Sequence, residues 1–431
     1  MSNSKTPNMV VIGALGLLSS LGEWYDFFIT AILAATVWPS IFYPNLSSSV
    51  ALSLGAASFG ITFLSRPLGA LVLGHYSDKV GRRQVILWSS LVTAVCSLAI
   101  AFVPSYALIG LVGVYFIVFL RFLIGLGLGG NYGGAASWVS EFAQRSSRRG
   151  LWGAFIQASV SLGTALPAFA LWAMSTYITN ADVVAWGWRL AVGVGVLMFV
   201  PGAIVRYRYS ESPMFSQLKA TKAVERSPVI VMLREKWVLV LALGLVTFPS
   251  FVWTSGLQNP YAISYLVMSH VPMSSLMLAL WVSQAFGTVM RFGFGYLADK
   301  IGRKLVAVIG ALWMAIAAFP YFWIANTLNI TYIMLDFALV GLGNAMSNTV
   351  IASILTEHFP TKYRASGVGF TLQIAGLYAG LLVTFLVPVI LEYYGGILKA
   401  WPGIAWMMVV SSILSVIPLF FLKETKNIDL T

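Results

Sequence analysis

Long apolar runs alternate with short polar segments along almost the whole chain. A helix that crosses the hydrocarbon core of a bilayer needs about 20 consecutive, mostly apolar residues. Runs of this kind predict membrane-spanning helices at 9–38, 50–76, 84–103, 106–140, 150–175, 188–208, 236–259, 273–297, 305–325, 329–355, 365–391 and 401–422. The pattern therefore predicts an all-α integral membrane protein with twelve transmembrane helices.

The longest segment without such a run extends from Tyr209 to Glu235. Charged side chains are frequent in it, at Glu211, Lys219, Lys222, Glu225, Arg226 and Arg234. We interpret it as a water-exposed linker between two six-helix bundles. The predicted organisation is an N-terminal bundle at 1–208, a cytoplasmic linker at 209–235 and a C-terminal bundle at 236–431.

Composition agrees with a membrane protein and excludes a soluble domain. Hydrophobic residues make up 59% of the 431 positions and charged residues 9%, against about 45–50% and about 25% in soluble domains. The net charge of +12 is spread over short segments between apolar runs, so we expect no nucleic-acid partner. One cysteine, Cys96, and three scattered histidines offer no metal-ligand cluster, and we expect neither a metal nor a cofactor.

The positions of lysine and arginine predict the orientation. Most of them lie in alternate polar segments and in the two tails, while the remaining segments hold almost none, apart from Lys399 and from Arg189 at the outer start of the sixth predicted helix. Cytoplasmic segments of membrane proteins are enriched in these residues. We therefore expect a multi-pass protein of the plasma membrane with both termini in the cytoplasm.

The two halves of the chain are repeats of each other. The segment Gly74–Arg83 (GHYSDKVGRR) recurs as Gly295–Lys304 (GYLADKIGRK). Two shorter patterns recur at nearly the same separation, namely Gly125-x-Gly127 as Gly341-x-Gly343, and Glu141 with Arg148 as Glu357 with Arg364. A duplicated six-helix unit is typical of a transporter whose site lies between the halves. The predicted fold is therefore two pseudo-symmetric bundles.

These motifs resemble the major facilitator superfamily, and within it the metabolite:proton symporter family. Further motifs that carry the resemblance are Glu23-Trp24-Tyr25-Asp26, Arg66-Pro67-Leu68-Gly69, Arg121–Gly125, Gly129–Gly134, Glu211-Ser212-Pro213 and Phe359-Pro360-Thr361. The resemblance implies a carrier of a small organic anion or zwitterion, such as shikimate, 2-oxoglutarate, citrate, proline or betaine, which functions as a monomer. One position departs from the family pattern, because Asn131 stands where the family usually has a glutamate. The fifth helix lacks the glycine–proline pattern of drug/proton antiporters, which favours import.

Ionisable groups inside a membrane helix are costly, and they are candidates for function by default. Glu23 and Asp26 are three residues apart on one helix face, and two carboxylates this close cannot both ionise cheaply, so we expect at least one to hold a proton. Proton-coupled sugar carriers of the superfamily pair a first-helix aspartate with a fourth-helix arginine, which implies a pair of Asp26 with Arg121. Asp26 could instead be a static counter-ion, and Glu23 could simply be hydrated.

Three arginines within predicted helices, Arg66, Arg121 and Arg291, favour an anionic substrate, because a guanidinium binds a carboxylate through two parallel hydrogen bonds. Arg66 could also serve helix packing, and Arg291 could extend towards the membrane surface. Asp336 is predicted either as a second proton site or as part of an outer salt bridge. Six further side chains are candidate substrate contacts, although each could also be an interhelical hydrogen bond: Tyr25, Asn131, Gln157, Trp253, Gln258 and Gln373.

The repeated charged loops predict a cytoplasmic gate. Opposite charges at the helix ends of both halves can hold that side closed and separate when it opens. The residues concerned are Asp78, Arg82, Glu141, Arg148, Asp299, Arg303, Glu357 and Arg364.

The sequence thus predicts a proton-coupled symporter that works by alternating access, with a carboxylate or zwitterion, protons and the lipid bilayer as its partners. The alternative is an uncoupled facilitator of a small polar metabolite. No nucleophile–base pattern points to an enzyme.

Overall fold

The computed structural model describes residues 8–46, 48–144, 146–208, 213–221, 225–254 and 261–428. Within these ranges it contains helices and turns, and no described residue lies in a β-strand. The long helices are α1 (Met9–Thr36), α3 (Ser48–Val80), α4 (Arg82–Ala101), α6 (Leu111–Phe142), α7 (Arg149–Tyr177), α9 (Trp188–Arg208), α11 (Pro228–Phe251), α13 (Met273–Ile301), α14 (Arg303–Ala325), α15 (Ile330–Thr349), α17 (Arg364–Tyr394) and α18 (Trp401–Phe421). Each predicted run coincides with one of them, so the twelve-helix prediction is confirmed over the described residues.

Short elements connect the long helices. They are α2 (Trp38–Phe42), α5 (Tyr106–Ile109), α8 (Asn180–Asp182), a π-helical turn at Val183–Gly187, α10 (Pro213–Ala220), α12 (Ile263–Met268), α16 (Ile351–His358), which continues α15 after Val350, and a 3-10 turn at Thr361–Tyr363. Nine described helical segments are long and apolar enough to cross a membrane by these two properties alone.

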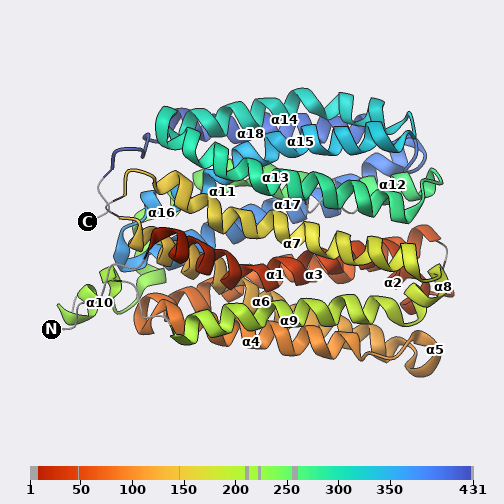
Figure 1. The fold of residues 1–431 in the computed structure, drawn as a ribbon, viewed down its shortest axis with the longest axis horizontal. Coiled ribbons are helices and arrows are strands. Elements are labelled where there is room, and N and C mark those ends of the chain that lie inside the picture. Colours follow the sequence, from red (N-terminus) through yellow and green to blue (C-terminus); the bar gives the residue numbers. More distant parts are fainter. Residues whose placement is uncertain are drawn as a thin grey trace.

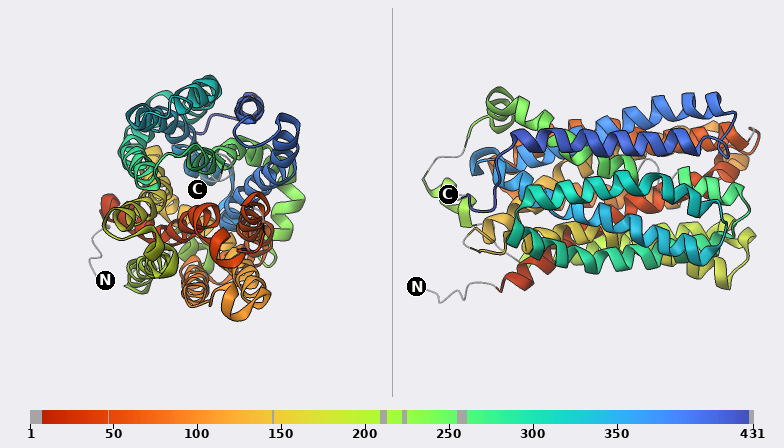
Figure 2. Two further views of the ribbon diagram at one scale, coloured as in Figure 1. Left: turned by 90° about the vertical axis from the view of Figure 1, so that its right-hand side faces the viewer. Right: turned by 90° about the horizontal axis from the view of Figure 1, so that it is seen from above.

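The long helices run side by side along one direction (Figure 1). Viewed along their axes, α1–α9 gather in one half and α11–α18 in the other (Figure 2, left). The halves meet where α7 packs against α13 and where α17 packs against α3 and α6. Both chain ends lie at the same end of the bundle, which we call the terminal end (Figure 1).

The two halves approach each other closely because glycines face the interface near the terminal end. A Cβ atom added at Gly133 on α6 would lie 2.3 Å from the carbonyl oxygen of Ala365 on α17. At Gly150 on α7 it would lie 2.7 Å from the carbonyl oxygen of Gly295 on α13. Small residues let helix backbones touch in this way, as is usual between membrane helices. Any side chain at these positions would push the halves apart.

The surface of the bundle is rich in large apolar side chains, unlike the surface of a water-soluble protein. Examples from both halves include Trp88 (67% exposed), Leu197 (64%), Ile316 (76%) and Trp406 (58%). Soluble monomers seldom expose large contiguous apolar patches. The exposed apolar surface therefore fits a bilayer environment.

One helix boundary differs from the prediction. α11 begins at Pro228, within the segment predicted as linker, and its backbone is non-helical at Lys236 (φ −133°, ψ 18°). The predicted membrane run starts at this kink, because Arg234, Glu235 and Lys236 interrupt the apolar pattern. The helix thus extends into the charged segment but changes direction there.

Candidate functional site

An ion pair between Asp26 and Arg121 lies inside the N-terminal half. Nη1 of Arg121 on α6 is 2.8 Å from Oδ2 of Asp26 on α1, and both side chains are almost fully buried. Ser97 on α4 donates a hydrogen bond to Oδ1 of the same carboxylate. The pair is electrically neutral as a unit, and removing either partner would leave a buried charge without compensation.

Glu23 lies one turn before Asp26 and is also buried. The hydroxyl of Ser90 on α4 donates to Oε1 of Glu23 over 3.4 Å, and the amide of Asn131 on α6 donates to that hydroxyl over 3.3 Å. The guanidinium of Arg66 lies within electrostatic range of Glu23. Asn131 therefore contributes a neutral hydrogen-bond donor near Glu23, at the position where the family resemblance predicts a glutamate.

Arg66 on α3 is enclosed by aromatic rings from both halves. Its guanidinium carbon lies 5.6 Å from the ring centre of Trp24, 5.1 Å from that of Phe27 and 5.9 Å from that of Phe251 on α11. Such contacts stabilise a cation. Its Nε and Nη1 atoms are buried and form no hydrogen bond to any described residue. Arg66 therefore has donors available for a ligand.

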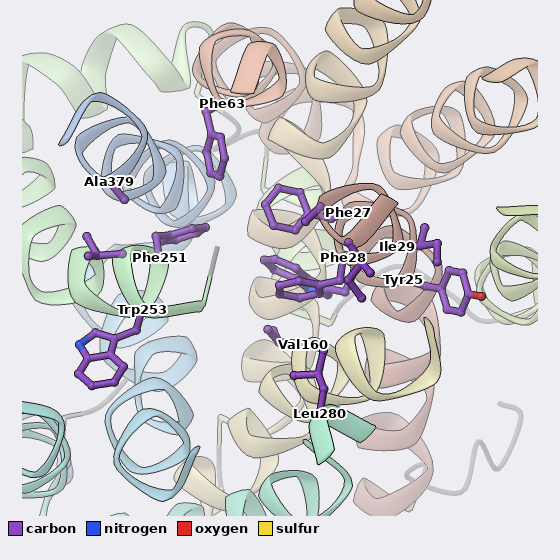
Figure 3. Packing of buried hydrophobic residues seen from close by; sticks show 14 of the residues in the cluster. Tyr25, Phe27, Phe28, Ile29, Phe63, Val160, Phe251, Trp253, Leu280 and Ala379 are labelled. Carbon is purple, nitrogen blue, oxygen red and sulfur yellow. The ribbon is translucent and has the colours of Figure 1, made fainter. Parts of the chain in front are cut away.

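The rings around Arg66 mark the contact between the halves. The rings of Phe63 on α3 and Phe251 on α11 are 6.5 Å apart, and Phe63 also packs on Phe27 at 5.6 Å. Figure 3 shows Phe27, Phe63 and Phe251 facing one another across the space between helices of the two halves. A ligand held by Arg66 would thus lie at the interface that an opening movement must change.

Arg291 on α13 also reaches across the interface. Its Nε donates to Oγ of Ser161 on α7 over 2.8 Å, and it lies within electrostatic range of the hydroxyl of Tyr132 on α6. The side chain is 2% exposed, and Nη1 has no hydrogen-bond partner among the described residues. It does not extend towards the membrane surface, which was one of the two predictions for it.

The two candidate glutamines differ in their hydrogen bonding. Nε2 of Gln157 on α7 donates to the carbonyl oxygen of Asn348 on α15 over 2.6 Å, so this amide links the halves. Gln373 on α17 is 1% exposed, and neither end of its amide has a hydrogen-bond partner among the described residues. Buried polar groups nearly always have partners. Gln373 is therefore the better candidate for contact with a ligand.

Asp336 on α15 lies buried in the C-terminal half. It forms no ion pair with any described residue, and its Oδ2 has no hydrogen-bond partner among them. The hydroxyl of Tyr321 on α14, in electrostatic range, is likewise buried without a partner. Burial without a counter-charge favours the neutral form of a carboxylic acid. The outer salt bridge that was one of two predictions for Asp336 is absent from the described residues.

Two predicted substrate contacts point elsewhere. The hydroxyl of Tyr25 donates to the carbonyl oxygen of Ala191 on α9 over 2.8 Å, on the side of α1 away from the interface (Figure 3). The indole of Trp253 donates to Ser412 on α18 over 3.1 Å. Each bond joins helices within one half, so both side chains already have a hydrogen-bond partner, and their contact with a substrate stays a prediction. Gln258 lies outside the described residues.

At the terminal end, the first charged loop forms hydrogen bonds to the other half of the molecule. The carboxylate of Asp78 accepts hydrogen bonds from the backbone nitrogens of Ala365 and Ser366, at 3.2 and 2.7 Å, and from the hydroxyl of Ser366 at 2.6 Å. It thereby caps the N-terminus of α17, where a negative charge is favourable. Glu141 on α6 binds Arg82 at 3.0 Å and, across the interface, Arg364 at 3.3 Å.

The second charged loop repeats this arrangement in reverse. Asp299 accepts hydrogen bonds from the backbone nitrogens of Gly150 and Leu151, at 2.8 and 2.9 Å, and so caps α7 of the N-terminal half. Glu357 on α16 binds Arg303 at 3.3 Å and, across the interface, Arg149 at 3.0 Å. The two networks join the halves through equivalent contacts. We call them the first and the second clamp.

Arg148 is outside this network, although its spacing from Glu141 predicted a part in it. It is exposed and precedes the first residue of α7, whereas Arg149 opens the helix and is buried. In the second half, Arg364 is likewise the first helical residue of α17. The loop after Glu141 is one residue longer than the loop after Glu357, so Arg149 is the structural counterpart of Arg364.

The C-terminal tail is a part of the second clamp that the sequence did not indicate. The Arg149 guanidinium donates to the carbonyl oxygens of Thr425, Lys426 and Ile428, at 3.2, 3.1 and 2.6 Å. Glu424 accepts hydrogen bonds from the backbone nitrogens of Arg303, Lys304, Thr425 and Lys426. Burial acts to raise the pKa of Glu424, but these N–H groups together lower it below its usual value. The sequence feature that could have indicated this contact is Glu424, an acidic residue between the basic residues Lys423 and Lys426.

Comparisons with known proteins agree with this geometry. Residues 20–383 match the family model described as Major Facilitator Superfamily. Among curated relatives, the shikimate transporter of Escherichia coli is 26% identical over 94% of this chain and 92% of its own length. The glycine betaine/proline/ectoine/pipecolic acid transporter of Dickeya dadantii is 26% identical over 95% and 82%. The solved proton:xylose symporter XylE has the same fold, with a TM-score of 0.77 at 21% identity over 98% of both chains.

Proposed function

The chain belongs to the Major Facilitator Superfamily, and from this premise we propose that it is a proton-coupled symporter of a small organic anion or zwitterion. Its relatives are transporters and not enzymes. The observation that carries the proposal is the buried Asp26–Arg121 pair. The aromatic enclosure of Arg66 includes Trp24 and Phe27 of α1, the helix that carries Asp26, and this supports a proton site that communicates with donors for a carboxylate.

Charge balance explains how such a pair couples two ligands. With Asp26 ionised, the pair is neutral and Arg121 is occupied. When Asp26 takes up a proton, its attraction for Arg121 falls, and a buried positive charge is left without a partner, which is unfavourable at mid-membrane. A substrate carboxylate then restores neutrality by binding the guanidinium. Proton and anion binding therefore favour each other, and the coupling is reciprocal.

Arg66 and Gln373 are the proposed additional contacts for the substrate. Arg66 offers unpaired N–H donors in a setting of aromatic rings, and Gln373 offers both a donor and an acceptor. Arg291 donates a hydrogen bond to Ser161 across the interface, and this bond is proposed to be specific to the closed arrangement of the halves. Glu23 is proposed to tune the affinity of Asp26 for protons. Asp336 is proposed as a second proton-binding group, in the C-terminal half.

The clamps are proposed to be the gate. We expect the terminal end to face the cytoplasm of the plasma membrane, because the basic segments lie there. Breaking the cross-half bonds of Asp78 and Asp299 would let the six-helix bundles at 1–208 and 236–431 rock apart around the substrate, with 209–235 as their linker. One chain contains both bundles and both clamps, so a monomer is the proposed functional unit.

The alternative function is an uncoupled facilitator, and reconstitution into liposomes distinguishes the two. In the wild type, an inward-directed pH gradient should drive accumulation of a radiolabelled carboxylate or betaine found by a thermal-shift screen. Asp26→Asn should abolish accumulation but leave exchange of labelled for unlabelled substrate. Asp182→Asn, at the end of α8 and in no ion pair with a described residue, is the matched control and should behave as the wild type. Accumulation by the Asp26→Asn variant would refute coupling through Asp26.

A further inference from the structure

A groove runs along the outer surface of the C-terminal half, between α11, α17 and α18. Its volume is about 1110 Å³. The walls are almost entirely apolar, for example Leu241 on α11, Leu381 on α17 and Ile417 on α18, which are 41%, 48% and 47% exposed. Because the chain spans a membrane, this apolar groove faces lipid.

The length of the groove matches one leaflet of a bilayer. Along α11 it extends from Glu235 to Phe248, a distance of about 20 Å at about 1.5 Å per helical residue. The hydrocarbon core of one leaflet is about 15 Å thick, half of about 30 Å. On α18 the groove ends at Leu422, close to the C-terminal tail, so its mouth lies at the terminal end. The groove can therefore hold one acyl chain of the leaflet on that side.

Positive charge is concentrated at the mouth. Lys236 lines it at the kink of α11, and Lys423 follows the lining residue Leu422. Neither lysine forms an ion pair or a hydrogen bond with a described residue. Lys304 adds a third ammonium group, whose Nζ donates to the carbonyl oxygen of Leu422 over 2.6 Å.

The acidic groups near the mouth are already engaged. Glu235 binds the ammonium of Lys362 at 3.2 Å and the hydroxyl of Tyr363 at 2.9 Å. The carboxylate of Glu424 accepts from four backbone nitrogens, as described above. The lysines at the mouth, Lys236, Lys304, Lys362 and Lys423, outnumber Glu235 and Glu424, so the mouth keeps a net positive charge at the membrane surface. Trp237, 58% exposed beside Lys236, is a residue type favoured at that depth.

From the apolar groove of leaflet length and the lysines at its mouth, we infer that the protein binds an anionic phospholipid there. One acyl chain lies along α11, and the phosphate and acidic headgroup lie at Lys236 and Lys423. The assignment to the cytoplasmic leaflet rests on the proposed orientation, but the binding itself does not depend on the transport function. A zwitterionic lipid would fill the same groove without matching its charge, so preference for a net negative headgroup is the distinguishing property.

Native mass spectrometry of the purified full chain tests this inference, with phosphatidylglycerol and phosphatidylcholine as probes. The wild type should bind phosphatidylglycerol more tightly. A lysine near the membrane surface contributes about 1 kcal/mol of attraction to acidic lipid, so the double variant Lys236→Gln/Lys423→Gln should lose about fivefold in affinity for each lysine. Its affinity for phosphatidylcholine should not change. Lys79→Gln/Lys219→Gln, which removes two exposed lysines at the terminal end of the other half and the linker, is the control.

A second variant tests the groove itself. Ala242→Trp fills the groove with an indole and should weaken binding of both lipids, whereas Ala94→Trp on α4, also half-buried, should not. Equal affinity of the wild type for the two lipids would overturn the inference and indicate ordinary boundary lipid. Unchanged phosphatidylglycerol affinity in both Lys236→Gln/Lys423→Gln and Ala242→Trp would overturn it as well. Since no step requires transport, these outcomes are independent of the proposed symport.

Discussion

Arg121 on α6 and Asp336 on α15 occupy corresponding helices of the two halves. Arg121 stands four residues before Gly125 and Asp336 five residues before Gly341, the repeat partner of Gly125. They differ in whether an opposite charge lies beside them. Arg121 is paired with Asp26 at 2.8 Å, while Asp336 has no ion-pair partner among the described residues.

At the terminal end of the molecule, by contrast, the two halves form equivalent contacts. The two clamps use the same residue types in the same contacts, with each loop aspartate capping a helix of the other half. The duplicated chain has thus kept its clamps alike and diverged at mid-membrane. Chemistry that is needed twice, to join the halves, remained symmetric. Chemistry that acts on one ligand did not, and the buried Asp26–Arg121 ion pair of the N-terminal half has no counterpart at Asp336 among the described residues.

The largest expected effect is loss of the charge partner in the N-terminal half. Arg121→Gln leaves Asp26 buried without a cation, which should destabilise the protein by about 3–5 kcal/mol. Adding Asp26→Asn removes the unpaired charge and should restore most of this loss. Thermal and chemical unfolding in detergent would measure both. If the double variant is no more stable than Arg121→Gln, the pair is not the electrostatic unit described here.

The clamps are expected to give the next largest effect, and a symmetric one. Asp78→Asn and Asp299→Asn each weaken charge-assisted hydrogen bonds to the opposite half, worth about 1.5–3 kcal/mol. Each should shift the population towards a form open at the terminal end by about 10- to 150-fold. Spin labels at Lys79 and Lys300, on a Cys96→Ser background, would report the distance distribution. A shift in only one variant would show that the clamps are unequal despite their matching geometry.

Asp336→Asn should change coupling but hardly stability. The substitution breaks no ion pair with a described residue, so the free energy of unfolding should stay within about 1 kcal/mol. If Asp336 carries a second coupled proton, its loss should lower accumulation by about tenfold for each unit of the pH gradient, since one unit corresponds to about 1.4 kcal/mol. Uptake in liposomes at graded pH differences measures this. Unaltered accumulation would assign all coupling to the N-terminal half.

The sequence predicted the parts of this comparison that depend on unusual residue types in unusual places. Twelve apolar runs predicted the helices, because a membrane requires length and apolarity that few other structures share. Asp26 and Arg121 could be predicted because few charged residues interrupt the first and fourth runs.

Other features depended on tertiary geometry. Trp24 and Tyr25 are neighbours in the sequence but point about 100° apart around α1, so only the packing of α1 on α9 shows that Tyr25 faces away from the interface. The choice of Arg149 over Arg148 depends on a loop that is longer by one residue. Glu424 meets Arg303 through contacts between segments distant in the chain, and no local pattern encodes them.

The smallest expected effect concerns the C-terminal tail, which contacts the second clamp. The pKa of Glu424 is lower in the docked tail than its usual value of about 4.3. The stabilisation of tail docking by Glu424 is therefore fully present above the usual pKa. It is lost as the pH falls through the lowered pKa of the docked tail. Glu424→Gln should weaken docking by about 1 kcal/mol or less, because solvent reaches one side of the carboxylate. Hydrogen exchange of the Thr425 and Lys426 amides should then be up to about fivefold faster near pH 7. At acidic pH the wild type should approach the variant, and the control Glu225→Gln, in the linker, should match the wild type at each pH. Equal protection in Glu424→Gln and the wild type near pH 7 would show that Arg149 alone holds the tail, and that the second clamp differs from the first by an arginine contact rather than by the carboxylate.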